Sequence, residues 1–422
     1  MGHGELVSRR FSFLANSGYA TVSAGSAVLL LLLLMLAGRV LTAVDYGKFS
    51  FALALATIVE TIMDIGLGPV TVREVARDRE GAGRFFQNVL GLKLLWVAGG
   101  LALLMIIAPL LRSDPAVVRA CYLLGISSAV RSYLLTARGL LQGLNRFDVE
   151  AAVVVSDRVL LLVFGTTALV GGYGLDGLCV AFVAARLLMC GGVAWIVHAV
   201  TRSVRPTFDR DTWRRIQKAA LPLGFFMITL NLYTYIDTVI LGLMRSDAET
   251  GWYAAAYRVY EGLTYAPAIL SAVLTPRFSY LFVHDRSALR SQFVRALVGA
   301  VVLGIVLGAA AYGLAGPILM LLFGASYAPA VVPLQVLAGG ALLVFSTWIL
   351  HAAAIATNLD RRLLVTTAVG LGSNVALNLL LIPRFGIAGA AWATVVAEAA
   401  TVVLLFAQVQ HRMRTAPSQA AV

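Results

Sequence analysis

The stretch AVLLLLLLMLAG, residues 27–38, decides the fold class of this chain. Its six consecutive leucines cannot form a strand of a membrane β-barrel, because such strands alternate apolar and polar residues over about ten positions. A helix that crosses a bilayer needs about 20 mostly apolar residues, and the residues before the leucines supply that length. We therefore predict a first membrane span at residues 11–37.

The rest of the chain is equally apolar. Of the 422 residues, 60% are hydrophobic and 13% are charged, whereas soluble domains average about 45–50% and about 25%. A globule of this size cannot bury so much apolar surface, so lipid must cover the remainder. Helices hold such long runs in lipid because they satisfy their own backbone polar groups. The sequence therefore predicts an all-α polytopic membrane protein and excludes a soluble one.

We predict about 12 transmembrane helices from the apolar runs. They lie near residues 11–37, 46–69, 86–111, 117–141, 150–171, 176–200, 219–244, 251–276, 293–314, 329–356, 363–382 and 386–408. The least regular region is 316–356, where three prolines interrupt any simple helix.

The basic residues predict the orientation. With the N-terminus inside, 22 Lys and Arg fall in cytoplasmic segments, Arg138 among them, 6 fall in outer segments and 5 within spans. Such an excess marks the cytoplasmic side, so the net charge of +12 implies no nucleic-acid partner. Both termini are predicted to be cytoplasmic.

The spans divide into two sets of six. We predict an N-terminal lobe of residues 1–200, a basic cytoplasmic linker of 201–218, a C-terminal lobe of 219–410 and a cytoplasmic tail of 411–422. Gly47 and Phe49 recur as Gly251 and Tyr253, at an offset of 204. Because each half holds an even number of spans, the two halves are predicted to be parallel repeats.

Motifs along nearly the whole chain resemble those of one family. They are Gly38–Leu41, Asp45–Phe49, Asp64–Leu67 and Arg73–Arg77 in the first half, and Tyr235–Asp237, Gly251–Arg258, Leu274–Pro276 and Ile382–Thr394 in the second. In order and spacing they are similar to bacterial polysaccharide-biosynthesis flippases of the O-antigen type. These belong to the oligosaccharide branch of the multidrug/oligosaccharidyl-lipid/polysaccharide (MATE-like) superfamily.

The resemblance implies a structure and a task. It implies two six-helix lobes around a central cavity in the bacterial cytoplasmic (inner) membrane, which work by alternating access. The implied substrate is a polyprenyl-pyrophosphate-linked oligosaccharide, carried from the inner to the outer leaflet for cell-surface polysaccharide synthesis. Membrane lipids surround such a protein, and a polysaccharide polymerase and glycosyltransferases are implied as partners.

Charged residues inside spans are the candidate site residues, because they are costly in lipid unless paired or hydrated. Arg131 and Arg186 lie near mid-span with no acid three or four positions away. We interpret them as cavity residues that bind pyrophosphate, for which guanidinium groups are well suited. The alternative is a structural ion pair across helices, for example with Glu60 or Glu398.

Other residues are candidates for the same cavity. They are Lys93, Arg158, Arg258, Arg39, Tyr257 and Tyr260. For each a structural alternative stays open: Lys93, together with the neighbours Asp157 and Arg158, can snorkel to the interface, and Arg258 can pair with Glu261. Arg39 can be an interface anchor, and the tyrosines can belong to an aromatic belt.

Three acids are candidates for ion coupling. Glu60, Asp237 and Glu398 can take up H⁺ or Na⁺, or can pair with the arginines instead. No cofactor and no metal site is otherwise expected, and no nucleophile elbow or P-loop occurs. We therefore predict a transporter and not an enzyme.

Three alternatives stay open. The first is a cation-coupled multidrug or small-molecule antiporter of the same superfamily, which needs acids and not arginines in its cavity. The second is a membrane polysaccharide polymerase or ligase, which needs a larger outer loop than this chain offers. The third is a structural membrane partner, which needs no charge within the spans.

Overall fold

The computed structural model describes residues 18–19, 22, 25–201 and 205–415. These residues form helices and turns, with no strand among them. The fold is that of a polytopic all-α membrane protein, as predicted. The start of the first predicted span, part of the linker and the end of the tail lie outside the described residues.

The described chain folds into two compact units. Unit 1 comprises the described residues up to Leu41 and Phe51–Asn231, and unit 2 comprises Thr42–Ser50 and the described residues from Leu232 on. The predicted lobes and linker stay a prediction.

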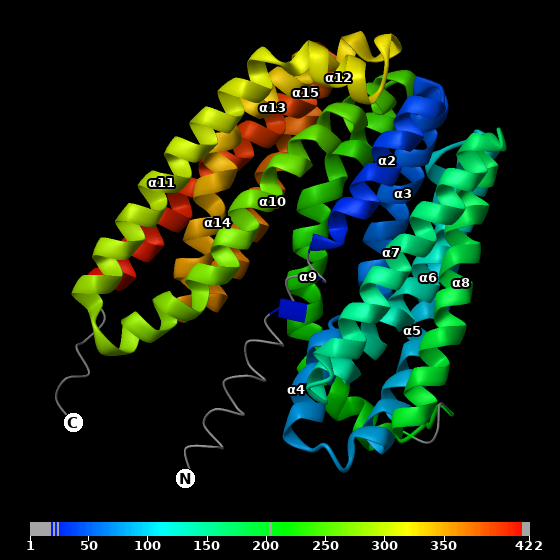
Figure 1. Ribbon diagram of the computed structural model, residues 1–422, viewed down its shortest axis with the longest axis vertical. Coiled ribbons are helices and arrows are strands. Elements are labelled where there is room, and N and C mark those ends of the chain that lie inside the picture. Colours follow the sequence, from blue (N-terminus) through cyan, green and yellow to red (C-terminus); the bar gives the residue numbers. More distant parts are fainter. Residues whose placement is uncertain (1–17, 20–21, 23–24, 202–204, 416–422) are drawn as a thin grey trace. The chain divides into compact units, whose positions relative to one another are not determined.

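Unit 1 is a bundle in which one helix lies at the centre (Figure 1). Its elements are α2 (Ala27–Val40), most of α3 (Ala43–Asp64), α4 (Leu67–Arg77), α5 (Ala82–Leu111), α6 (Pro115–Gly143), α7 (Phe147–Val170), α8 (Gly174–Thr201) and the first part of α9 (Arg210–Met244). Helix α6 packs against α4, α5, α7 and α8. Side chains on several faces of α6 therefore contact neighbouring helices inside this unit.

Unit 2 contains the remaining helices. They are the start of α3, the rest of α9, α10 (Asp247–His284), α11 (Arg286–Gly313), α12 (Ala315–Leu322), the 3-10 helix η1 (Ala325–Ala330), α13 (Val331–Gly339), α14 (Ala341–Ala356) and α15 (Asp360–Thr415). Helix α15 is two helices joined at Gly386, whose φ of 57° and ψ of −135° are not helical. Arg245 donates to the carbonyls of Ile382 and Pro383 just before this break, which lies where the sequence placed the boundary between two spans.

Within the part of the chain that the structure describes, eight helical segments are long and apolar enough to cross a membrane, or nine if the segments Ala325–Gly339 and Ala341–Ala356, bent by 45°, form one span. This bend lies in the region that the prolines marked as irregular. Helix α6 has 29 residues but is too polar to belong to this group. Two of the three charged residues of α6, Arg131 and Arg138, belong to the site described below.

A contact between two glycines supports the predicted repeat. In unit 2, a Cβ on Gly47 would overlap the backbone of Asp247, and a Cβ on Gly251 would overlap the backbone of Ala43. Residues 43 and 47 are each 204 positions from residues 247 and 251, so the contact is reciprocal. A reciprocal contact is what a two-fold relation between repeats produces, and only glycine permits so close an approach.

Candidate functional site

Unit 1 holds its buried charges in ion pairs that join different helices. Removing a charged group from water is costly, so a buried charge needs a partner of opposite sign. The pairs are Lys93 Nζ–Asp64 Oδ1 at 2.5 Å, Arg131 Nη1–Glu60 Oε1 at 2.6 Å, Arg138 Nη2–Glu150 Oε1 at 2.6 Å and Arg186 Nε–Asp157 Oδ1 at 3.1 Å. They connect α3 with α5 and α6, α6 with α7, and α7 with α8.

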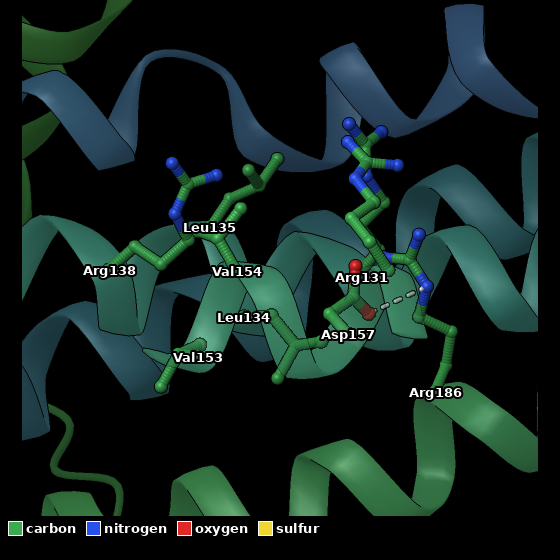
Figure 2. A pocket seen from close by; sticks show the side chains of 9 residues that line it. Arg131, Leu134, Leu135, Arg138, Val153, Val154, Asp157 and Arg186 are labelled. Carbon is green, nitrogen blue, oxygen red and sulfur yellow. Dashed lines mark ion pairs between the residues drawn. The ribbon is translucent and has the colours of Figure 1, made fainter. Parts of the chain in front are cut away.

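Four arginines and one aspartate line a single pocket among these pairs (Figure 2). Helix α6 contributes Arg131, Leu134, Leu135 and Arg138, α7 contributes Val153, Val154, Asp157 and Arg158, and α8 contributes Arg186. The spacing of three and four residues on α6 and α7 places each set on one helix face. The pocket is therefore rich in guanidinium groups, three of which are paired with the carboxylates of Glu60, Glu150 and Asp157, and we call it the arginine pocket.

The arginine pocket is closed at one end and open at the other. The side chains of Arg186 and Asp157 are 5% and 11% exposed, whereas those of Arg131 and Arg138 are 30% and 29% exposed. The free volume is about 20 Å³, which is room for about one water molecule. An anion as large as pyrophosphate therefore meets Arg131 and Arg138 first and enters further only if the side chains move.

The innermost pair keeps hydrogen-bonding capacity. Figure 2 shows Arg186 of α8 extended toward Asp157 of α7. At 3.1 Å the two groups attract each other, but Arg186 Nε and Asp157 Oδ1 make no hydrogen bond within the protein. Buried polar atoms usually find such a partner, so this guanidinium can still donate to an anionic ligand.

The structure decides several structural alternatives left open by the sequence. Arg131 does pair with Glu60, whereas Arg186 pairs with Asp157 and not with Glu60 or Glu398. The alternative that Lys93 and Asp157 snorkel does not hold. Lys93 is 0% exposed, bonded to Asp64 and Thr136, and Asp157 lies in the middle of α7. Arg158, half-buried, lines the pocket.

Arg138 was missed as a site residue. It was counted with a cytoplasmic segment, but it lies within α6 and donates from Nε to Glu150 at 2.8 Å. The available signal was its spacing of seven residues from Arg131, two helical turns along one face. Arg39, by contrast, is exposed in the last turn of α2 and does not line the arginine pocket.

Unit 2 holds its buried acids with neutral donors. Asp237 accepts from the Tyr253 hydroxyl, from the Thr394 hydroxyl at 3.3 Å and from the Thr238 backbone N–H at 2.8 Å. Glu398 accepts from the Tyr233 hydroxyl at 2.5 Å. Among the described residues neither acid forms an ion pair, so the expected alternative that they pair with the arginines was wrong. Their role in coupling to H⁺ or Na⁺ stays a prediction.

The other candidates of unit 2 lie together on α10. Arg258 is buried and pairs with Glu261 at 2.5 Å, so the two neutralise each other as the sequence suggested. The rings of Tyr257 and Tyr260 are 5.9 Å apart, and Tyr260 is buried in an apolar core cluster. Whether these three residues contact a substrate stays a prediction.

Comparison with protein families and curated proteins gives consistent matches. The sequence model of the family described as "Polysaccharide biosynthesis protein" matches residues 13–282. The probable low-salt glycan biosynthesis flippase Agl15 of Haloferax volcanii is 21% identical over 87% of this chain and 76% of its own length. The probable flippase AglR of the same organism is 28% identical, but the match spans only 45% of this chain and 40% of that protein.

Solved structures share the fold. An inward-facing multidrug resistance MATE family transporter of the MOP superfamily superposes with a TM-score of 0.77 at 15% identity, over 94% of this chain and 96% of that one. The lipid II flippase MurJ in an inward closed conformation gives 0.75 at 15% identity, over 93% and 87%. At such identities the similarity concerns the fold alone, since one fold hosts many functions.

Proposed function

The chain belongs to the polysaccharide biosynthesis protein family, and from this premise we propose that it is a flippase for lipid-linked glycans. The proposed substrate is a polyprenyl-pyrophosphate-linked oligosaccharide, which moves from the inner to the outer leaflet of the cytoplasmic membrane. A polymerase and glycosyltransferases would act on the same lipid-linked glycan. The names of the two relatives, both probable flippases, support this proposal.

The arginine pocket is the observation that carries the proposal. A pyrophosphate presents several anionic oxygens, and planar guanidinium groups bind such oxygens through paired, charge-assisted hydrogen bonds. The pocket offers four guanidinium groups and a single carboxylate on its wall. Arg131 and Arg138 at the open end receive the headgroup, and Arg158 and Arg186 lie behind them.

The carboxylates partnered with these arginines have a role in the same proposal. In the absence of substrate, Glu60 and Glu150 neutralise Arg131 and Arg138 and limit the cost of burying them. The arriving headgroup replaces the carboxylates as the anionic partner. Because the arginines exchange one anion for another, the headgroup can be released again on the other side of the membrane.

We propose that transport occurs by alternating access of the two predicted repeats. The contact of Gly47 with the first turn of α10 would join one predicted repeat to the other. This contact is close enough that the two backbones can slide or pivot without side chains between them. A side chain at this point would hold the repeats apart.

Flipping of the lipid-linked glycan by purified protein in proteoliposomes tests the proposal. We expect Arg131→Gln/Glu60→Gln, which removes both members of a pair and so leaves no lone buried charge, to lower the flipping rate by about tenfold or more because about one charge-assisted contact to phosphate is lost. Gly47→Ala should also lower the flipping rate, because its Cβ would overlap the backbone of Asp247. Gly299→Ala is the matched control, because a Cβ there meets nothing within 4 Å.

The same assay distinguishes a flippase from the leading alternative, an antiporter. A wild-type protein that does not flip the lipid-linked glycan, but exchanges small cations or drugs across the same vesicles, would identify an antiporter. Retained flipping in the Arg131→Gln/Glu60→Gln variant would keep the flippase but remove the arginine pocket from its mechanism.

A further inference from the structure

A second cavity of unit 1 adjoins the arginine pocket. It has a volume of about 260 Å³ and lies between α5, α6 and α8, and its lining consists of apolar side chains together with Tyr133 and Cys190. An apolar cavity of about 150 Å³ is enough to hold a benzene molecule. This one, which we call the apolar groove, therefore accepts a longer piece of hydrocarbon.

One residue of α6 belongs to both cavities. Leu134 lines the arginine pocket and the apolar groove. At 3.6 residues per turn, Arg131, Leu135 and Arg138 lie on one side of Leu134, and Tyr133 and Ala137 lie on the other. The two cavities therefore occupy adjacent faces of the same helix and share one wall.

Helix α8 makes the same connection along its length. Arg186 lines the arginine pocket, and Cys190, Val193 and Val197 line the groove. These positions are four, seven and eleven residues beyond Arg186, so all four residues lie on one face of α8. A ligand that extends along this face passes from a guanidinium group to a purely apolar surface within about one helical turn.

The groove has a buried floor and an accessible rim. Phe86, Val193 and Val197 are 1%, 3% and 2% exposed, whereas Cys190 and Leu90 are half-buried and Ala194 is exposed. Next to the rim, Trp195 on α8 is 73% exposed. Large apolar side chains exposed on a membrane-spanning helix face lipid, so the groove is open to the hydrocarbon of the bilayer.

We propose that the apolar groove binds the first part of the polyprenyl chain while the arginine pocket binds the pyrophosphate to which that chain is attached. This inference rests on the proposed function and deepens it, because it assigns the lipid half of the substrate to named residues. The occupant must carry an anion and a hydrocarbon chain on adjoining atoms, and the shared Leu134 wall matches that pattern. With the predicted orientation, the groove lies at the cytoplasmic ends of α5, α6 and α8, where the inner leaflet supplies the substrate.

The groove selects by shape and not by hydrophobicity. Lipid tails are as apolar as the groove, so entering it brings no hydrophobic gain, and association within a bilayer depends on packing and polar contacts. The methyl-branched polyprenyl chain fills an irregular cavity differently from a straight acyl chain. The anchored headgroup holds the start of the chain at the mouth of the groove.

Cys190 supplies a native probe of occupancy. Of the three cysteines, Cys121 and Cys179 are buried, and Cys190 is half-buried in the groove. The full-length protein in proteoliposomes is treated with N-ethylmaleimide, and modification of each cysteine is followed by mass spectrometry. We expect polyprenyl pyrophosphate to slow modification of Cys190 by about tenfold at about ten times its Kd, and inorganic pyrophosphate to leave it unchanged.

Two results would overturn the assignment. Equal protection by phosphatidylglycerol at the same mole fraction means that the groove takes ordinary acyl chains, and no protection by polyprenyl pyrophosphate means that the chain binds elsewhere.

A variant gives a second, independent readout. Ala194→Trp places a large ring at the rim of the groove, and we expect it to weaken binding of polyprenyl pyrophosphate by about tenfold while binding of inorganic pyrophosphate is retained. Ala199→Trp, also exposed on α8 but outside the groove, is the matched control. Unchanged binding in Ala194→Trp contradicts the inference.

If wild-type protein flips the lipid-linked glycan although Cys190 is never protected, the groove assignment fails and the proposed function stands. If it does not flip the glycan, the proposed function fails whatever the groove binds.

Discussion

The two units stabilise their buried charged side chains in different ways. Unit 1 buries basic and acidic groups together, in ion pairs that join α3, α5, α6, α7 and α8. Unit 2 buries Asp237 and Glu398 among hydroxyl donors, and its buried arginine pairs within one helix. A guanidinium with an exchangeable partner suits an anion, whereas a carboxylate held by neutral donors suits a proton or a cation. We therefore propose that substrate recognition and ion coupling reside in different parts of the chain.

The largest expected effect concerns the ion pair of unit 1 whose basic residue is fully buried. Lys93→Met leaves Asp64 without its cation, and removing one partner of a buried pair costs about 3–5 kcal/mol. We expect a correspondingly large loss of unfolding free energy, measured by denaturation of the protein in detergent. Lys93→Met/Asp64→Leu should recover most of it, since no lone charge remains. A single variant as stable as the double one would show that this pair is not a structural element.

An intermediate effect is expected in unit 2. In Asp237→Asn, the hydroxyls of Tyr253 and Thr394 can still donate to an amide oxygen, but each hydrogen bond loses its charged acceptor. We expect a loss of about 1–3 kcal/mol in the same denaturation measurement, smaller than for Lys93→Met. A loss as large as that of Lys93→Met would mean that Asp237 carries more of the fold than its neutral partners suggest, and the contrast between the units would disappear.

The smallest effect is expected for a pair at the surface of unit 1. Arg119 and Asp176 lie 3.0 Å apart with 57% and 52% of their side chains exposed. Exposed pairs contribute only about 0–1 kcal/mol. Arg119→Ala should therefore unfold at nearly the wild-type denaturant concentration, which makes it the baseline for the two buried cases. A loss of unfolding free energy above this range would show that burial does not account for the difference between Arg119→Ala and the two buried variants.

Much of the fold could be predicted from the sequence, because the constraint of lipid is local. Each predicted span after the first corresponds to helical segments, the first does so over its described part in α2, and the glycine at 386 interrupts α15 where a span boundary was expected. The division of span two at Ile65 and Gly66 was not predicted. Both residues have positive φ, of 42° and 78°, and isoleucine gives no local signal for such a conformation.

The site was predicted only in part, because pairing depends on how helices pack. Arg131 and Arg186 were identified from their depth along single helices. Their partners Glu60 and Asp157 lie on other helices, and no sequence spacing specifies that contact. Arg138 was missed because hydropathy defines the end of a span only to within a few residues, and a charge near that end is ordinarily attributed to the interface.

Binding of inorganic pyrophosphate to the purified protein, measured by isothermal titration calorimetry, tests directly whether the arginine pocket binds the headgroup. Arg138→Gln/Glu150→Gln removes a whole ion pair from the open end of the arginine pocket, and Asp237→Asn alters only the hydroxyl-held acid of unit 2. We expect the first variant to bind about tenfold or more weakly, since a charge-assisted contact to phosphate is lost, and the second to bind like the wild type. Wild-type affinity in Arg138→Gln/Glu150→Gln would contradict a role of the arginine pocket in binding the headgroup.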